Sequence, residues 1–256
     1  MSAVITFSQF KGGSLKTTST FNVAFALAKK GYKVLAIDLD PQAHLTYYAG
    51  IPEEQAEEHS IYETLTALKP LQMHEVTTDT GTVDFCASHI SVEFAVNELI
   101  NVSLGELRLK KAVDKVKDGY DFVLIDTPPS LGILTQSALI ASDYVFIPTP
   151  PEFMPTNGLS KQLESLDSFK RNNDLGFEIK GVFMAKFDQR KNLNKDVSKA
   201  VREQLGDLVM ESVIRENVSL AETSGLHTDI FTYSPRSHGA EDYENLTREI
   251  LRRINK

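Results

Sequence analysis

The stretch "FSQFKGGSLKTTSTFNVAFALAKKGYKVLAIDLDPQAHLT", residues 7–46, decides the fold. It overlaps an apolar run, "AVITFSQ" at residues 3–9, which stops just before a pair of glycines. Apolar side chains then recur at helical spacing over residues 17–31, which end in a glycine typical of a helix stop. A second apolar run at residues 32–40 ends in two carboxylates. The order strand, glycine loop, helix, strand predicts a βαβ unit.

The rest of the chain repeats this alternation of apolar runs and helical patterns. Further strands are expected at residues 82–88, 121–129, 143–151 and 179–187. These runs lack polar alternation, which is typical of strands that are buried on both faces of a sheet. We therefore predict an α/β fold in which helices flank a doubly wound, mostly parallel sheet, and a single domain that spans residues 1–256.

One of the helical patterns, residues 104–120, is strongly amphipathic. Lysines occupy one side of it, and the inward positions are expected to be Leu104, Leu107, Val113 and Val116.

The amino-acid composition limits the classes of protein to which the chain can belong. A chain of 256 residues with 41% hydrophobic and 24% charged residues is ordinary for a soluble globular protein. The net charge of -8 argues against a globally basic nucleic-acid binder, although local basic patches are compatible with it. The one cysteine, Cys86, excludes an intramolecular disulfide and suits the cytoplasm. No apolar run approaches the ~20 residues that a bilayer span needs.

The segment "KGGSLKTT", residues 11–18, lies between the first strand and the first helix. Such a loop directs backbone N–H groups and a helix N-terminus at one point, which attracts phosphate. Gly12 and Gly13 allow the backbone to approach an anion closely. The strict phosphate-loop pattern G-x-x-x-x-G-K-[ST] nevertheless fails at Phe10 and Leu15, where glycines are expected.

Three side chains after the glycines suit phosphate and metal chemistry. Lys16 is placed to reach β- and γ-phosphates, and the Thr17 hydroxyl to bind Mg²⁺. Thr18 either donates to an α-phosphate or is an ordinary helix residue.

Three carboxylates follow predicted strands. Asp126 ends the apolar run "FVLI" and resembles a Walker B carboxylate, while Asp38 and Asp40 end the neighbouring strand. A single aspartate at a strand end is more often a helix cap than a metal partner. Here the glycine loop, the Lys-Thr pair and all three carboxylates follow strands, and together they predict a nucleotide site.

These segments together resemble the ParA/Soj/MinD family of deviant Walker ATPases. The family loop K-G-G-x-x-K-[ST] fits "KGGSLKTT", with Leu15 where glycine is usual. "DLDPQAHLT", residues 38–46, is similar to the family's D-x-D-P-Q segment. Residues 120–153 are similar to its Walker B segment and following strand, and residues 234–250 to its C-terminal helix. The resemblance covers nearly the whole chain and implies a P-loop NTPase architecture.

The resemblance implies a slow, Mg²⁺-dependent ATPase in which ATP closes a homodimer around two nucleotides. Lys11 would reach across to the phosphates of the partner subunit, and Lys16 would serve its own nucleotide. Asp40 matches the residue that positions or activates the attacking water. Thr17 would bind the Mg²⁺ ion, and Asp38 and Asp126 would order the Mg²⁺ shell.

The nucleotide-binding set that the resemblance implies is Lys11, Gly12, Gly13, Ser14, Leu15, Lys16, Thr17, Thr18, Phe187 and Pro235, the last two on the adenine side. Leucine at a positive φ would be strained. We therefore expect Leu15 to keep a negative φ and to direct its side chain away from the phosphates, towards the dimer seam. Nucleotide binding would then persist and hydrolysis would be slow.

The family also implies partners. Its DNA-segregation members bind non-specific DNA as ATP dimers, and a partner such as a ParB-like or cargo-adaptor protein stimulates hydrolysis and releases them. The cargo is a plasmid, a chromosome or another body, and the protein is cytoplasmic and nucleoid-associated. Basic residues that would track DNA phosphates are Lys186, Arg190, Lys195, Lys199, Arg202 and Arg215. Any single lysine among them is better explained as part of a solvated helix face, whereas the group, together with the family resemblance, favours DNA.

Three other functions stay open, one of them a nucleotide-dependent metabolic enzyme on the same scaffold, for which the sequence identifies no small-molecule pocket. A MinD-like member would attach to membranes through its C-terminal helix, but the apolar positions of this tail are expected to dock on the core. They are Leu246, Ile250, Leu251 and Ile254. A nucleotide switch with little hydrolysis is the third alternative. An iron–sulfur relative on the same scaffold would need bridging cysteines, which Cys86 alone does not supply.

Overall fold

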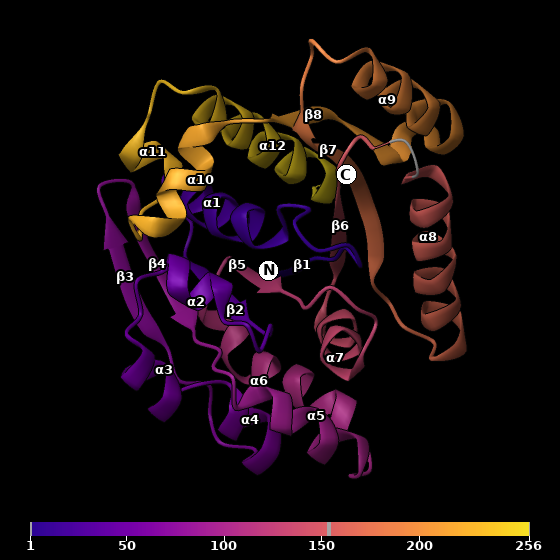
Figure 1. The fold of residues 1–256 in the computed structure, drawn as a ribbon. Coiled ribbons are helices and arrows are strands. Elements are labelled where there is room, and N and C mark those ends of the chain that lie inside the picture. The colour runs from indigo at the N-terminus through magenta and orange to yellow at the C-terminus, as the bar shows by residue number, and fades with distance from the viewer. Residues whose placement is uncertain (1, 153–154, 256) are drawn as a thin grey trace.

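The computed structural model describes residues 2–152 and 155–255, which form an eight-stranded sheet with helices on both faces (Figure 1). The strand order is β3-β4-β2-β5-β1-β6-β7-β8, and every pairing is parallel except β3 with β4. The strands are β1 (Ala3–Phe7), β2 (Val34–Asp38), β3 (His74–Thr78), β4 (Gly81–Cys86), β5 (Phe122–Asp126), β6 (Tyr144–Thr149), β7 (Glu178–Phe187) and β8 (Val209–Arg215). The predicted doubly wound, mostly parallel α/β sheet is confirmed.

Helices cover the sheet in two layers. The helices are α1 (Lys16–Ala28), α2 (His44–Tyr48), α3 (Glu53–Glu58), α4 (Tyr62–Ala67), α5 (Val92–Ile100), α6 (Arg108–Val116), α7 (Ile133–Ala141), α8 (Pro155–Asn172), α9 (Asn192–Leu205), α10 (Val218–Gly225), α11 (Ile230–Tyr233) and α12 (His238–Ile254). Three short 3-10 turns span Gly105–Leu107, Lys117–Gly119 and Gly206–Leu208. Phe153, the last residue of the segment at 120–153 that carried the family resemblance, lies outside the described residues.

The strands distribute their side chains to two cores. Phe122 and Leu124 of β5 pack with α1, α11 and α12, whereas Val123 and Ile125 pack with α5, α6 and α7. This alternation follows from the two-residue period of a strand. Because both faces are covered, the central strands are almost continuously apolar, as their sequences predict.

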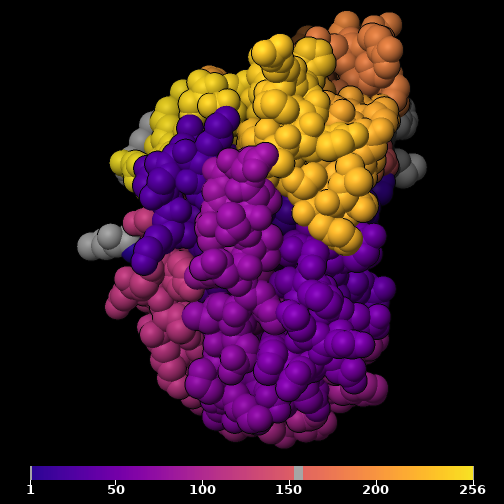
Figure 2. Space-filling view, turned by 90° about the vertical axis from the view of Figure 1, so that its left-hand side faces the viewer, coloured from indigo at the N-terminus to yellow at the C-terminus, as the bar shows by residue number. Residues whose placement is uncertain are grey.

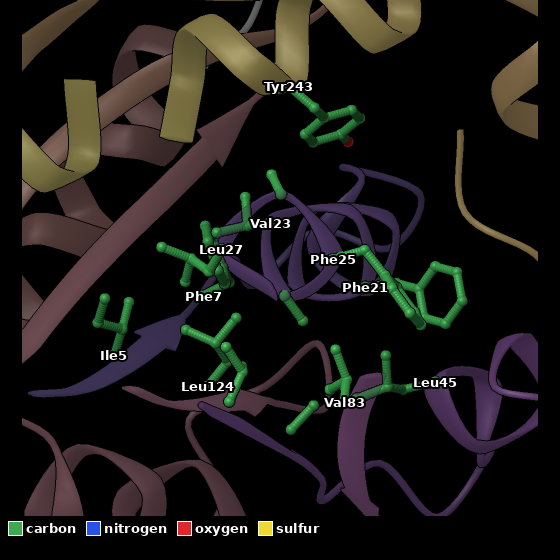
Figure 3. Packing of buried hydrophobic residues seen from close by; sticks show 14 of the residues in the cluster. Ile5, Phe7, Phe21, Val23, Phe25, Leu27, Leu45, Val83, Leu124 and Tyr243 are labelled. Atoms are coloured by element: carbon green, nitrogen blue, oxygen red, sulfur yellow. The ribbon is translucent and has the colours of Figure 1, made fainter. Parts of the chain in front are cut away.

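Helix α1, which begins at the glycine loop, is buried on almost every side. Phe21 and Phe25 pack against the β4 side of the sheet, and Tyr243 of α12 covers the opposite side of the helix (Figure 3). The Tyr243 and Ser19 hydroxyls are 3.1 Å apart and hydrogen-bonded in this core. The helix therefore holds the loop at its N-terminus in a fixed position relative to the sheet.

The two outer strands were not expected from the sequence. β3 carries no fully buried residue, and it pairs antiparallel with β4 as a hairpin. Figure 2 shows this hairpin beside the C-terminal part of the chain, where the Thr80 hydroxyl donates a hydrogen bond of 2.7 Å to Asp229.

The amphipathic prediction for residues 104–120 was wrong at Leu104, which is exposed and precedes the helix; Leu109 is buried there instead.

Candidate functional site

Residues 8–15 connect β1 to α1 at the carboxyl edge of the sheet. Gly13 has φ +70, a left-handed conformation that glycine adopts without a Cβ penalty. A Cβ built on Gly12 would meet no atom within 4 Å. The loop therefore presents an open backbone surface at the N-terminus of α1, which is the arrangement that favours anions.

Leu15 does not have the negative φ that we expected. It has φ 68 and ψ 26, and it forms the N-cap of α1 in a left-handed conformation. Its side chain lines the cavity above the loop and packs, partly buried, against the core cluster around α1 and α12. The tight turn into α1 fixes this backbone geometry, and the packing of the side chain retains it despite the strain.

Lys16 and Thr17 open α1 directly below the loop. Lys16 is buried, and burial lowers the pKa of its ammonium, although the fields of Asp126 and Asp40 oppose this shift. The Thr17 hydroxyl donates a hydrogen bond of 2.6 Å to Asp126 Oδ2. The Ser14 hydroxyl is buried without a partner among the described residues.

The predicted carboxylates meet because their strands are neighbours. Asp126 of β5 is in register with Asp38 of β2 on one side and with Phe7 of β1 on the other. Asp38 accepts hydrogen bonds from the Thr46 amide at 2.9 Å and from the Thr46 hydroxyl at 2.8 Å. The Asp40 amide donates to Asp38 Oδ1 at 3.0 Å, and the Gln42 amide donates to Asp40 Oδ1 at 3.0 Å, so the turn after β2 holds both carboxylates.

The electrostatics of this group suit a cation. Burial raises the pKa of Asp38, and the neighbouring Asp126 raises it further. Burial also raises the pKa of Asp126, and the hydrogen bond from Thr17 and the charge of Lys16 only partly offset this effect. Asp126 Oδ1 is buried and has no hydrogen-bond partner within residues 2–152 and 155–255. A divalent cation would neutralise these carboxylates and satisfy the orphaned oxygen, so the site fits Mg²⁺.

The carboxylates do not form a complete metal cage. In the described part of the chain, no three His, Cys, Asp or Glu side chains are grouped closely enough to hold a metal ion. Mg²⁺ commonly takes one or two carboxylates and fills its remaining positions with water and substrate phosphates. The Thr17–Asp126 pair therefore suits an ion that arrives with a nucleotide.

A cavity of about 690 Å³ lies above the loop. Its floor is Gly12 to Thr18, and Asp40 lies in its wall. The other walls were not predicted from the sequence, and they come mainly from α2 and from the start of α10. These walls include Tyr48, Asn217, Val218 and Leu220. Asn217 caps α10 by accepting a hydrogen bond of 2.8 Å from the Ser219 amide, a capping pattern that was present in the sequence.

Lys11 lies at the rim of the loop. Its ammonium forms an ion pair with Glu152, and both side chains are more than half exposed. The Lys11 side chain is thus directed away from the buried carboxylates, and an exposed ion pair of this kind exchanges readily.

Two predicted adenine-side residues lie elsewhere. Phe187 lines a separate shallow depression with Lys195 and Lys199 of α9, because the end of β7 packs on that helix. Pro235 lies in the turn between α11 and α12, and the cavity is bounded instead by the start of α10. The structure therefore does not bring Phe187 and Pro235 to the cavity.

The predicted DNA-binding residues also separate. Arg215 is held by Asp242 and Glu241, and Arg190 makes two hydrogen bonds of 3.0 Å to Asp188. Their charges are largely neutralised within the subunit. Lys186 lies in the wall of the cavity above the loop.

Three of the basic residues remain together on α9. Lys195 and Lys199 are exposed one turn apart, and Arg202 follows on the same face. Arg202 donates a hydrogen bond of 2.8 Å to the Met210 carbonyl, and Lys199 lies 3.8 Å from Glu203. This α9 surface, defined by Lys195, Lys199 and Arg202, is what the structure retains of the basic stripe.

The last helix docks as expected. Leu246 and Ile250 of α12 are fully buried in the core with α1, and Leu251 and Ile254 pack at its edge. Among the described residues, no helix is both long enough and apolar enough to cross a membrane.

Known proteins are similar to this chain in sequence and in fold. The family model AAA_31, an AAA domain, matches residues 2–179. The sporulation initiation inhibitor protein Soj of Bacillus subtilis is 36% identical over 250 residues, which cover 98% of each chain. The chromosome-partitioning ATPase Soj of Treponema pallidum is 35% identical, over 99% of this chain and 98% of its own. A structure of cobyrinic acid a,c-diamide synthase from Mycobacterium smegmatis, with bound ATP analogue and magnesium, has a TM-score of 0.86 at 26% identity. The match covers 100% of this chain and 97% of the synthase.

Proposed function

The chain belongs to the ParA/Soj family of P-loop ATPases, and from this premise we propose that it hydrolyses ATP to segregate or position a cargo on DNA. The observation that carries the proposal is the hydrogen bond from half-buried Thr17 to buried Asp126 beneath an open glycine loop, with Lys16 beside it. This arrangement combines a phosphate cradle with an unsatisfied carboxylate oxygen. The cobyrinic acid a,c-diamide synthase, which has the same fold, binds an ATP analogue and magnesium.

We assign ATP to the cavity and Mg²⁺ to the Thr17–Asp126 pair, with Asp38 ordering the surrounding water. Mg²⁺ bound there would neutralise charge on the phosphates. The loop amides and Lys16 bind the phosphate chain, and the charge-assisted hydrogen bonds of Lys16 strengthen because it is buried. Asp40 lines the cavity, where it would orient the attacking water.

The active form is proposed to be a homodimer that sandwiches two ATP molecules. Lys11 is exposed at the rim, so it can leave Glu152 and reach the phosphates of the partner subunit. A flexible stem with a compact ammonium suits this movement. Residues 1–256 would act as one ATPase domain in this dimer.

The α9 surface supplies the proposed contact with non-specific DNA. Lys195 and Lys199 are exposed, and dimerisation would double the number of their phosphate contacts. The chromosome-partitioning relative supports a segregation role. A ParB-like or cargo-adaptor partner would stimulate hydrolysis, and the protein would work in the cytoplasm on the nucleoid.

The membrane and switch alternatives have less support. The apolar side of α12 is occupied by the core, which removes the surface that a membrane-binding tail would use. A switch with little hydrolysis rests on Leu15 in place of the usual glycine, and phosphate release with and without DNA separates it from an ATPase that turns over.

The experiment is DNA binding by fluorescence anisotropy with a random duplex, in ATP, ADP or no nucleotide, across a salt series. We expect binding that requires ATP and weakens steeply with salt. The double variant Lys195→Glu/Lys199→Glu should reduce the salt slope by roughly one for each lost phosphate contact in the dimer. Lys111→Glu, an exposed lysine on α6, is the matched control.

The possible outcomes test different parts of the proposal independently. Binding that the α9 double variant leaves unchanged refutes the α9 surface but not DNA binding. Absence of binding, together with ATP-dependent attachment to anionic vesicles, favours the membrane alternative. Absence of phosphate release, with and without DNA, refutes the ATPase itself.

A further inference from the structure

Lys186 has an unusual backbone conformation for a lysine in a strand. It is the penultimate residue of β7 and has φ 57, in the left-handed region. The register between β7 and β8 shifts at this point, between Ala185 and Phe187. A bulge of this kind re-aims a side chain, and bulges are frequent beside active sites. Backbone strain at a residue with a Cβ points to a functional reason for retaining it.

The re-aimed side chain lies over the glycine loop. A Cβ built on Gly13 would be 3.8 Å from Lys186 Nζ, the nearest atom it would meet. Lys186 also lines the cavity above the loop. Its ammonium is therefore beside the backbone that the proposed function assigns to phosphate.

Lys186 also lacks a counter-charge. Its ammonium makes no hydrogen bond or ion pair with any residue in the described ranges, 2–152 and 155–255. The nearby cations differ: Arg190 binds Asp188, Lys191 binds Glu216 at 3.0 Å, and Arg215 binds Asp242. Lys186 thus keeps an uncompensated positive charge at the mouth of the cavity.

We propose that Lys186 is a third lysine of the phosphate site, which binds the phosphate chain of the nucleoside di- or triphosphate in its own subunit. This inference rests on the proposed function, because it requires a nucleotide in the cavity. Lys16 approaches from the helix below the loop and Lys186 from β7 above Gly13, so the two ammonium groups would hold the chain from different sides. Lys11 remains available for the partner subunit.

The same ammonium was a candidate contact for DNA phosphates. Its position beside Gly13 favours the nucleotide, because an anion at the loop lies within its reach and the α9 surface is on a different element. A lysine suits this task, since its ammonium is a compact point charge on a flexible stem.

The test is the affinity of Lys186→Met for a fluorescent, non-hydrolysable ATP analogue, with ADP and inorganic pyrophosphate as competitors. Losing one charge-assisted hydrogen bond should raise Kd about 10-fold for all three ligands. Pyrophosphate has no base or ribose, so a weaker affinity of Lys186→Met for pyrophosphate would show that Lys186 contacts phosphate. Lys186→Arg should restore part of the affinity, and Lys111→Met on α6 should bind like the wild type.

Lys186→Gly is a second variant that removes the ammonium and suits the left-handed backbone, so it keeps the test valid if the methionine variant folds poorly. Wild-type and variant proteins that bind all three ligands equally overturn the inference and leave the proposed function intact. Variants that lose only DNA binding also overturn it, and assign Lys186 to DNA. A wild-type protein that binds no nucleotide overturns both.

Discussion

Replacing Leu15 with glycine and with alanine gives a direct test of the loop conformation. Leu15 occupies the left-handed region at φ 68, where a Cβ collides with the backbone. Alanine removes most of the side chain but keeps the Cβ, whereas glycine removes both. The difference in stability between Leu15→Gly and Leu15→Ala therefore isolates the backbone strain from the packing of the leucine.

The magnitude follows from two opposing effects. A left-handed conformation costs an L-residue with a Cβ roughly 1–2 kcal/mol. Glycine avoids this cost but loses about 0.5–1 kcal/mol through the greater freedom of the unfolded chain. We expect Leu15→Gly to be more stable than Leu15→Ala by about 1 kcal/mol, or roughly 2–4 °C in Tm for a chain of this size. The partly buried leucine side chain itself contributes about 1 kcal/mol, so Leu15→Gly should be close to the wild type.

The assay is urea and thermal unfolding of both variants without nucleotide. The control is the same pair of substitutions at Lys111, which is exposed in the middle of α6, where glycine should be less stable than alanine by about 1 kcal/mol. If Leu15→Ala is as stable as Leu15→Gly while the Lys111 pair behaves normally, the left-handed conformation of Leu15 is refuted. Phosphate release by the same variant tests whether leucine slows hydrolysis: unchanged turnover in Leu15→Gly would remove that idea.

Two further predictions concern buried carboxylates. Burial alone would raise the pKa of Glu249, but hydrogen bonds from Ser212 and its neighbours outweigh burial and hold the pKa below its usual range. Stability from this depressed pKa is present above the unfolded value and disappears as pH falls through the folded pKa. Glu249→Gln should therefore cost about 2 kcal/mol at neutral pH and progressively less in acid, as urea titrations from about pH 7 to 3 would show; a constant difference contradicts this. Asp126→Asn should raise the stability of the nucleotide-free protein by about 1 kcal/mol, because it removes a buried charge whose pKa burial raises. The same variant should lose the thermal shift that Mg²⁺ and an ATP analogue give the wild type, and a retained shift would exclude Asp126 from the metal site.

The central strands could be predicted because they are buried on both faces. Phe122–Asp126 and Val34–Asp38 contain no exposed position, so their sequences are continuous apolar runs. The two outer strands, β3 and β8, are not continuous apolar runs. His74–Thr78 alternates half-buried and exposed residues at an edge of the sheet, and Val209–Arg215 is interrupted by exposed Glu211. His74–Thr78 packs on one face only, whereas Val209–Arg215 contributes to two cores but its apolar run is broken by polar residues, so neither carries a strong apolar signal.

The residues at the floor of the site could be predicted from the sequence because of the sheet topology. Parallel strands place their carboxyl ends at one edge, so aspartates after β2 and β5 had to meet near the loop after β1. The residues of the upper walls could not be predicted from the sequence. Tyr48 and Val218 come from helices whose docking depends on the whole core, and neither has a local motif. Phe187 was placed wrongly because alternation along a strand sends neighbouring side chains to different sides.

Backbone conformation explains why the expectation at Leu15 was wrong and why the sequence did not mark Lys186 as a cavity residue. Leucine and lysine rarely adopt a positive φ, so sequence argued for ordinary backbone at Leu15 and Lys186. Both have a left-handed conformation, and both line the same cavity. Five other described residues with a Cβ also have a positive φ, namely Ala43, Leu68, Leu104, Asp174 and His227, so a strained backbone alone does not mark a site. Leu15 and Lys186 stand out because both line the cavity at the glycine loop, where strain can serve binding.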